Sequence, residues 1–165
     1  MESIELIRDN LIKSRERTLA RIEEMRDHGH VAPTANGGGG TLWILGHLAY
    51  IEGLVIRAFM QGEPNPLHDW ESFFDGVDAK LDSYEAPTFD DVLAQCRAMR
   101  EATLDLIDTL TEADLDRASA ASPEGHEATF GTYRLCLQFV ADHWYMHRGQ
   151  LAAARRSAAI DRMWF

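Results

Sequence analysis

Residues 142–151, DHWYMHRGQL, place two histidines four positions apart in a segment whose apolar side chains recur every three or four residues. This spacing is typical of an amphipathic helix and predicts one that begins between Thr129 and Thr132 and ends near Ser157. The apolar line of this helix consists of Cys136, Val140, His143, His147, Leu151 and Ala154. Both histidines are therefore expected to face the core of the protein.

Two inward imidazoles on one helix face have two interpretations. A single histidine in a core is more often a hydrogen-bonded structural residue than a metal ligand. However, side chains at positions i and i+4 lie close enough to bind one ion between them, and an unsatisfied buried polar group costs about 1–3 kcal/mol. A shared cation removes that cost, so His143 and His147 are candidate metal ligands.

Helical spacing predicts three further helices, over about 3–27, 41–62 and 88–109. Thr41 is expected to cap the second of these by accepting a hydrogen bond from a free backbone amide. Thr88, which is followed three residues later by an aspartate, resembles a capping box at the start of the third.

Between the second and third predicted helices, residues 62–87 are rich in Pro, Asp, Gly and Ser, with scattered aromatic residues. This composition predicts a long crossover loop that contains one helical turn. Four amphipathic helices occur with no convincing alternating strand and no internal repeat. The sequence therefore predicts an all-α fold, a four-helix bundle with a long crossover between helices two and three. At 165 residues, the chain is expected to form a single domain over residues 1–165.

Charge and hydropathy disfavour two classes of partner. The formal net charge of -11 argues against nucleic acid, because a protein needs a basic face to bind phosphates. The longest apolar run, around 42–59, is interrupted by polar and charged side chains, and no basic segment followed by an apolar one opens the chain. We therefore expect a cytoplasmic protein that binds neither nucleic acid nor membrane. Cys96 and Cys136 are expected to be small buried side chains rather than a disulfide.

A third inward histidine lies in the second predicted helix. His47, in the stretch LWILGHLAY, shares its face with Ile44, Leu48 and Ile51. A metal held by three protein ligands keeps a position open to water or substrate, as catalytic sites do. The Glu-x-x-His motif of di-iron bundles and the His-Glu-x-x-His motif of zinc proteases are both absent. The remaining histidines are expected to be solvated: His28, His30, His68 and His126.

Together, LWILGHLAY and DHWYMHRGQLAAARR resemble the histidine motifs of the DinB-like (YfiT-like) superfamily of metal-binding four-helix bundles. The similarity extends over nearly the whole chain in helix order and loop placement. In that family one histidine of the second helix and two of the fourth hold a divalent metal, which implies His47, His143 and His147 as ligands. Characterised members include S-transferases and isomerases that use bacillithiol, mycothiol or glutathione. The identity of the metal stays open among Zn, Ni, Fe, Mn and Co, because imidazole suits several of them.

Three residues near the predicted ligands are candidates for supporting roles. Trp43, one turn before His47, and Tyr50, one turn after it, are candidates to line a substrate pocket, although aromatic residues at helical spacing more often pack in a core. Gln150, one turn after His147, is a candidate hydrogen-bond partner of that ligand. No catalytic residue beyond the metal ligands is predicted.

The sequence leaves three functions open. The resemblance implies a metal-dependent S-transferase, in which a low-molecular-weight thiol attacks an electrophilic substrate. An alternative is a non-catalytic metal-binding dimer related to stress. A third is a metal-dependent hydrolase, which needs a carboxylate base, and Glu52 is expected to point away from His47. Members of this family often form dimers. The apolar side chains in the C-terminal stretch IDRMWF are suited to contact a second copy of the chain, so we expect a homodimer.

Overall fold

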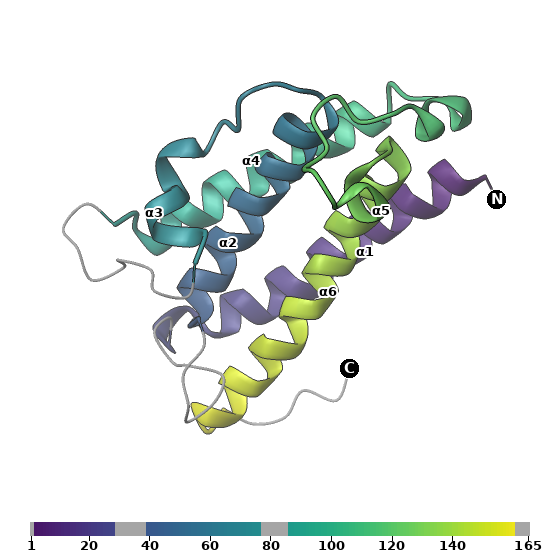
Figure 1. Cartoon of the computed structure of the whole chain (residues 1–165). Helices are drawn as coiled ribbons and strands as arrows, with labels where there is room; N and C mark the ends of the chain where they lie inside the picture. The colour runs from purple at the N-terminus through teal and green to yellow at the C-terminus, as the bar shows by residue number, and fades with distance from the viewer. Residues whose placement is uncertain (1, 29–38, 77–85, 161–165) are drawn as a thin grey trace.

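The computed structural model describes residues 2–28, 39–76 and 86–160 of the chain. The long helices are α1 (Ser3–Glu24), α2 (Thr41–Gly53), α4 (Phe89–Ile107) and α6 (Tyr133–Ser157), and the short helices α3 (Glu71–Phe74) and α5 (Glu127–Phe130) lie between them (Figure 1). Turns of 3₁₀ helix occur at Arg26–His28, His68–Trp70 and Glu112–Asp116. Within the described ranges, β-type pairing is limited to one bridge between Ala118 and Thr132. The predicted all-α bundle of four long helices is confirmed.

Helices α1 and α6 run in the same direction. The Thr18 hydroxyl donates a hydrogen bond to the Trp144 carbonyl across 3.4 Å, and further along both helices Arg155 pairs with Glu24 at 3.2 Å. Helices α2 and α4 run the opposite way beside them (Figure 1). Two neighbouring helices in sequence can be parallel only if the chain between them returns along the bundle, which explains the long crossover.

The described first part of the crossover is fixed to α2 by Asn65. Its side-chain amide donates to the Tyr50 carbonyl across 3.1 Å, and its Oδ1 accepts from the Leu67 amide across 3.0 Å. After the 3₁₀ turn, α3 places the fully buried Phe74 ring against Gly46, where a Cβ atom would lie 2.2 Å from that ring. The crossover is thus packed onto the helix that carries His47.

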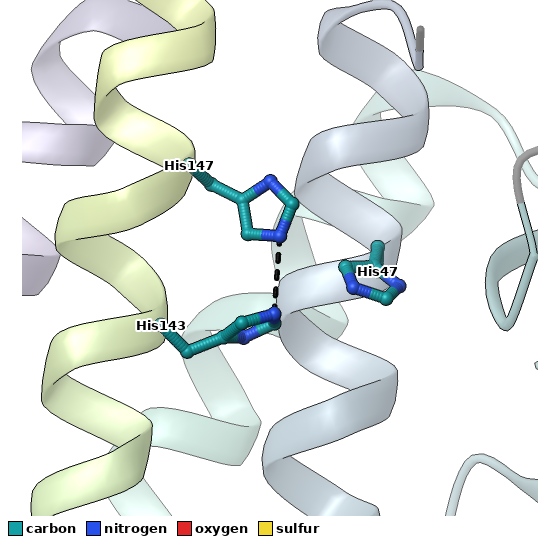
Figure 2. A group of neighbouring side chains, drawn as sticks. All are labelled: His47, His143 and His147. Carbon is teal, nitrogen blue, oxygen red and sulfur yellow. Dashed lines mark hydrogen bonds between the residues drawn. The ribbon is translucent and has the colours of Figure 1, made fainter.

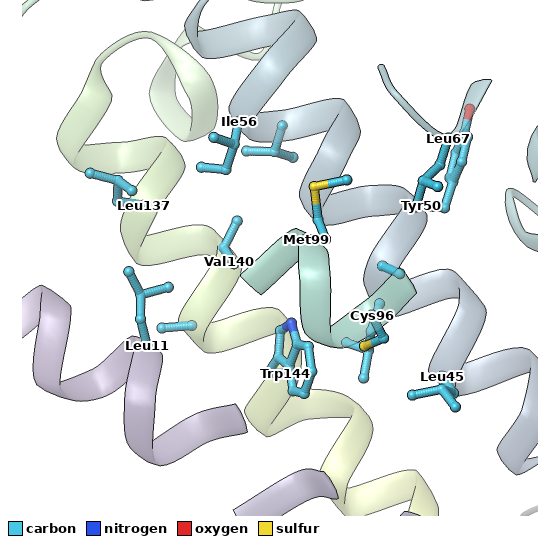
Figure 3. Close-up of a cluster of buried hydrophobic side chains, with 14 of the residues drawn as sticks. Leu11, Leu45, Tyr50, Ile56, Leu67, Cys96, Met99, Leu137, Val140 and Trp144 are labelled. Carbon is cyan, nitrogen blue, oxygen red and sulfur yellow. The ribbon is translucent and has the colours of Figure 1, made fainter. Parts of the chain in front are cut away.

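The core lies between the four long helices (Figure 3). Each of the four helices contributes apolar side chains to it. Burying one side chain of the size of leucine or valine contributes roughly 1.5–3 kcal/mol relative to leaving it exposed. Both cysteines are free and buried, as predicted. Representative core residues are Leu11, Leu45, Cys96, Leu137, Val140 and Trp144.

The N-terminal caps of α2 and α4 were both predicted from the sequence, wrongly for α2 and correctly for α4. The residue that caps α2 is Gly40, and Thr41 is the first helical residue, with a buried Oγ1 that has no hydrogen-bond partner among the residues described. The cap fails because a threonine inside the first turn no longer faces the free amides that a capping residue binds. At α4, the capping box of Thr88 and Asp91 is present.

The second helix changes its winding after Gly53 and continues as the π-helical segment Leu54–Met60. The wider turn changes which residues share a face of the helix. Within this segment the neighbours Val55 and Ile56 are each 1% exposed, whereas Phe59 is only partly buried. Ile51, which was expected on the inward face, is also only partly buried, although it lies in the regular helix before this segment. A spacing rule based on 3.6 residues per turn does not detect such a segment.

By length and composition alone, Thr41–Met60 is apolar enough to cross a membrane. Most of this segment is buried inside the bundle, so it has the character of a core helix.

Two predictions concern residues outside the described ranges. The prediction of a homodimer depends on the C-terminal residues 161–165, and the solvent exposure expected for the fourth histidine concerns His30. Dimerisation and the exposure of His30 therefore remain predictions.

Candidate metal centre

The three predicted ligands come together in the seam between α2 and α6. Figure 2 shows His143 and His147 extending from α6 toward α2, which carries His47. One ring nitrogen from each residue lies within 4.8 Å of the other two. His143 and His147 are 8% and 3% exposed, and His47 is partly buried. The histidines form a compact, mostly buried group on two helices that are far apart in sequence.

The spacing of these nitrogens fits a divalent cation. The Nε2 atoms of His143 and His147 are 3.0 Å apart. Nitrogen ligands about 2.0–2.1 Å from one tetrahedral metal lie roughly 3.4 Å from each other. All three nitrogens lie within 4.8 Å of one another, which is close to that spacing. A set of three imidazoles therefore suits a borderline metal ion better than it suits Ca²⁺ or Mg²⁺, which prefer oxygen ligands.

The crossover fixes the tautomer of His47. Its Nδ1 atom donates a hydrogen bond to the Phe74 carbonyl oxygen across 2.7 Å. Because a carbonyl only accepts, Nδ1 must carry the proton and Nε2 keeps its lone pair. Metal-bound histidines usually have such a partner on the nitrogen that does not bind the metal. The contact therefore leaves the lone pair of Nε2 available, as a metal ligand requires.

A side chain on α6 does the same for His147. Its Nδ1 atom lies 2.8 Å from Oε1 of Gln150, one turn further along the helix, and the amide oxygen accepts the hydrogen bond. Nε2 of His147 is then unprotonated, so the proton between the two α6 histidines belongs to Nε2 of His143. The structure thus places Gln150 where a hydrogen-bond partner of a ligand is needed. Its effect on metal binding stays a prediction.

Aromatic rings cover two of the histidines. The Trp43 indole stacks on His47 with ring centres 4.4 Å apart and an angle of 14° between the planes. Its Nε1 donates to the Gly76 carbonyl across 2.8 Å, which connects the indole to the residues after α3. Phe139 stacks on His143 in a similar way, at 5.4 Å and 15°. Flat apolar surfaces therefore border the candidate centre on both helices.

Tyr50 lies elsewhere on α2. It is 5% exposed, and its pKa is raised to about 12 by burial and by the charges of Asp75 and Glu71. The phenol is therefore neutral at physiological pH and lies near the acidic side chains of the crossover. It is not among the aromatic residues described in ring contact with His47, so a pocket role for Tyr50 stays a prediction.

All three histidines are held in the neutral form. Burial lowers the pKa of His143 to about 3, with a further decrease because a proton there is repelled by protonated His147 and His47. Burial, together with the same repulsion from protonated His47, lowers the pKa of His147 to about 4. The pKa of His47 is lowered by burial and raised in part by its hydrogen bond to Phe74 and by the charge of Asp75. Neutral imidazole is the form that binds metals.

Sequence reasoning missed four contributors to this site. The contact of Phe139 with His143 could have been predicted, because a residue four positions before His143 shares its helix face. Phe74, Asp75 and Gly76 follow a crossover that has no periodic pattern, so nothing in their spacing indicates that they meet His47 or Trp43. Three other histidines are exposed, as predicted: His28, His68 and His126.

Comparison with known proteins identifies relatives of the fold. The sequence profile of the DinB superfamily matches residues 4–151, a range that includes all three clustered histidines. A conserved protein from Enterococcus faecalis has a crystal structure similar to this one, with a TM-score of 0.67, 16% sequence identity, and coverage of 96% of this chain and 98% of that chain. At this identity the likeness shows a shared fold. Among curated proteins, no sequence matches.

Proposed function

Because the chain belongs to the DinB superfamily, we propose that its three clustered histidines hold a divalent metal ion and that the protein is a metal-dependent S-transferase. The substrates are a low-molecular-weight thiol, such as bacillithiol, mycothiol or glutathione, and an electrophilic small molecule. The observation that carries the proposal is the convergence of one ring nitrogen each from His47, His143 and His147 within 4.8 Å. The metal is one that imidazole suits: Zn, Ni, Fe, Mn or Co.

The protonation states of the ligands support this reading. His47 and His147 already present an unprotonated Nε2, because Phe74 and Gln150 hold the proton on Nδ1. At His143, the proton need only move from Nε2 to Nδ1 for the same atom to become a ligand. Since all three rings are neutral at pH 7, metal uptake requires no net loss of protons from them.

Three protein ligands leave at least one coordination position open. A divalent cation held here would lower the pKa of a bound thiol, so that its nucleophilic thiolate form is present at neutral pH. The residues of the chain supply the surroundings. Trp43 and Phe139 cover the faces of His47 and His143 and exclude water from them, and the same apolar surfaces suit the carbon skeleton of an electrophile.

A metal-dependent hydrolase is the second candidate, and one observation favours it. Asp75 lies close enough to His47 for its charge to raise the pKa of that ring, so a carboxylate is present near the centre. Glu52 is unsuited to the role of base, because both of its oxygens are engaged by Arg100 in the core. Replacing Asp75→Asn abolishes turnover by a hydrolase that uses this base, and leaves thiol transfer largely intact.

The proposal is tested with cobalt-loaded protein and a panel of thiols. Cobalt(II) reports its ligands through its absorption spectrum, so we expect one of the thiols to add a sulfur-to-metal charge-transfer band. The His47→Ala variant is the matched control and gives no such band. If the cobalt spectrum of the wild-type protein responds to no thiol, the S-transferase is excluded and the metal site remains as a separate claim.

A further inference from the structure

A fully buried ion pair lies in the core between α2 and α4. The Nε and Nη2 atoms of Arg100 bind the two carboxylate oxygens of Glu52 across 2.7 and 2.8 Å. The two side chains are 0% and 1% exposed. Taking two charges out of water costs free energy that their attraction offsets only when the geometry is good, and apolar residues of similar size are often at least as stable. Stability alone is therefore a weak explanation for this pair.

The two side chains of the pair also form hydrogen bonds to the other two long helices, α1 and α6. Oε2 of Glu52 also accepts a hydrogen bond from Nε1 of Trp144 on α6, across 3.1 Å. Nη1 of Arg100 donates to the Leu11 carbonyl on α1 and lies 3.4 Å from the hydroxyl of Ser14. The Arg100 guanidinium also lies over the Trp144 ring, 4.5 Å from its centre. All four long helices are joined at this one point.

Trp144 immediately follows His143 in the sequence and precedes His147 by three residues. Neighbouring residues of a helix point about 100° apart. A tryptophan fixed on the core side therefore sets the rotation of α6 that directs His143 and His147 toward α2. On α2, Glu52 follows His47 by little more than one turn, so the same contacts also hold the helix that carries the third ligand.

We propose that Glu52, Arg100 and Trp144 are positioning residues, which set the rotation and spacing of α2 and α6 so that the three imidazoles meet at metal-binding distance. The proposal rests on the metal site proposed above and adds residues that touch neither metal nor substrate. Residues that hydrogen-bond a metal ligand commonly change metal affinity by about 10–100-fold when removed. Because Trp144 acts through the position of the helix and not by a hydrogen bond to a ligand, we assign it the lower end of that range.

The test replaces Trp144→Phe, which removes the N–H group and keeps an aromatic ring for Arg100 to cover. The matched control is Ile107→Val, a small core deletion at the C-terminal end of α4, where Ile107 is 2% exposed. Two readouts are compared with the wild type: the cobalt dissociation constant with its absorption spectrum, and the ring ¹⁵N signals of His143 and His147 in metal-free protein.

We expect Trp144→Phe to weaken cobalt binding by about tenfold, to alter the cobalt spectrum and to shift both histidine signals. We expect Ile107→Val to lower the stability of the protein but to leave the cobalt affinity, the cobalt spectrum and the histidine signals unchanged. Wild-type affinity, spectrum and signals in Trp144→Phe overturn the proposal, as does an equal loss of affinity in the control. If the wild type binds no cobalt, the proposed function fails, while the metal-free signals still decide the positioning role.

A double-mutant cycle with Glu52→Met tests whether Trp144 acts through Glu52. Methionine is of similar length and has no side-chain oxygen, so the variant loses all three bonds that Glu52 accepts, including the bond from Trp144. If Trp144 acts through Glu52, the double variant binds cobalt no more weakly than Glu52→Met alone. Losses of affinity that multiply in the double variant would show that the two side chains act independently and would overturn the link between them. Should Glu52→Met fail to fold, the comparison of Trp144→Phe with Ile107→Val stands by itself.

Discussion

Nδ1 of His47 donates a hydrogen bond to the backbone carbonyl of Phe74 across 2.7 Å, and this contact joins a candidate metal ligand on α2 to the crossover. The crossover is thus part of the candidate centre as well as a connection between helices. The contact depends on close packing of α3 against α2, which is possible because residue 46 is a glycine.

The first prediction concerns that packing. A Cβ on residue 46 would lie 2.2 Å from the Phe74 ring, so Gly46→Ala forces α3 away from His47. We expect the free energy of unfolding to fall by about 1–3 kcal/mol, as in other overpacked cores, and metal binding to weaken. Urea denaturation and a metal titration measure both effects.

A second glycine gives the control. Gly149 lies within α6, next to the candidate ligands in sequence, and a Cβ there meets nothing within 4 Å. Gly149→Ala should therefore stabilise the protein by up to about 1 kcal/mol, because alanine favours the helix. If Gly46→Ala were as stable as Gly149→Ala, the described packing of α3 would be wrong.

The second prediction concerns Gln150. Its Oε1 accepts the hydrogen bond that holds the proton of His147 on Nδ1. Gln150→Ala should weaken metal binding by about tenfold with little change in stability, because the side chain is exposed. Competition with a chelator measures the affinity. Gln138→Ala, at another exposed position of α6, is expected to bind metal like the wild type, and a loss of the same size there would remove the role assigned to Gln150.

The third prediction is a pH dependence of the metal-free protein. Burial lowers the pKa of His143 to about 3 and that of His147 to about 4, whereas in the unfolded chain both lie near 6.5. Between these values the unfolded state binds more protons than the folded state. Stability is therefore complete above about pH 6.5 and falls as the pH decreases, by at most roughly 1.4 kcal/mol per pH unit for each histidine.

Urea denaturation at several pH values between 7.5 and 5 measures this slope, in a range above that in which most carboxylates titrate. The double variant His143→Gln, His147→Gln should show a flatter dependence, since it lacks both groups. A metal-free wild type whose stability is constant over this range would contradict the neutral, buried state of the two histidines.

How far the sequence predicts this structure differs between its parts. The long helices follow from apolar spacing, and that spacing also places His47, His143 and His147 on inward faces. Helical periodicity is a local property, so it is visible in one chain without further information. The π-helical segment Leu54–Met60 escapes the same rule, because its turn is wider than the period on which the rule depends.

The partners of the histidines divide in the same way. Gln150 was predictable, since its contact with His147 is a matter of one helical turn. Phe74 and Gly76 were not, because only the tertiary packing of the crossover brings their carbonyls to His47 and Trp43. The buried pair of Glu52 and Arg100 had a weak signal in the sequence, as two charged residues at apolar positions, but neither position identifies the other as its partner.

The central claim, that His47, His143 and His147 bind a divalent metal, is tested most directly by elemental analysis of purified wild-type protein beside His147→Ala. The exposed His126→Ala serves as the control for histidine content, and circular dichroism checks that each variant is folded. We predict about one divalent metal ion per chain in the wild type and in His126→Ala, and a large loss in His147→Ala, as expected when a three-histidine site loses one ligand. Equal metal content in wild type and His147→Ala would contradict the account.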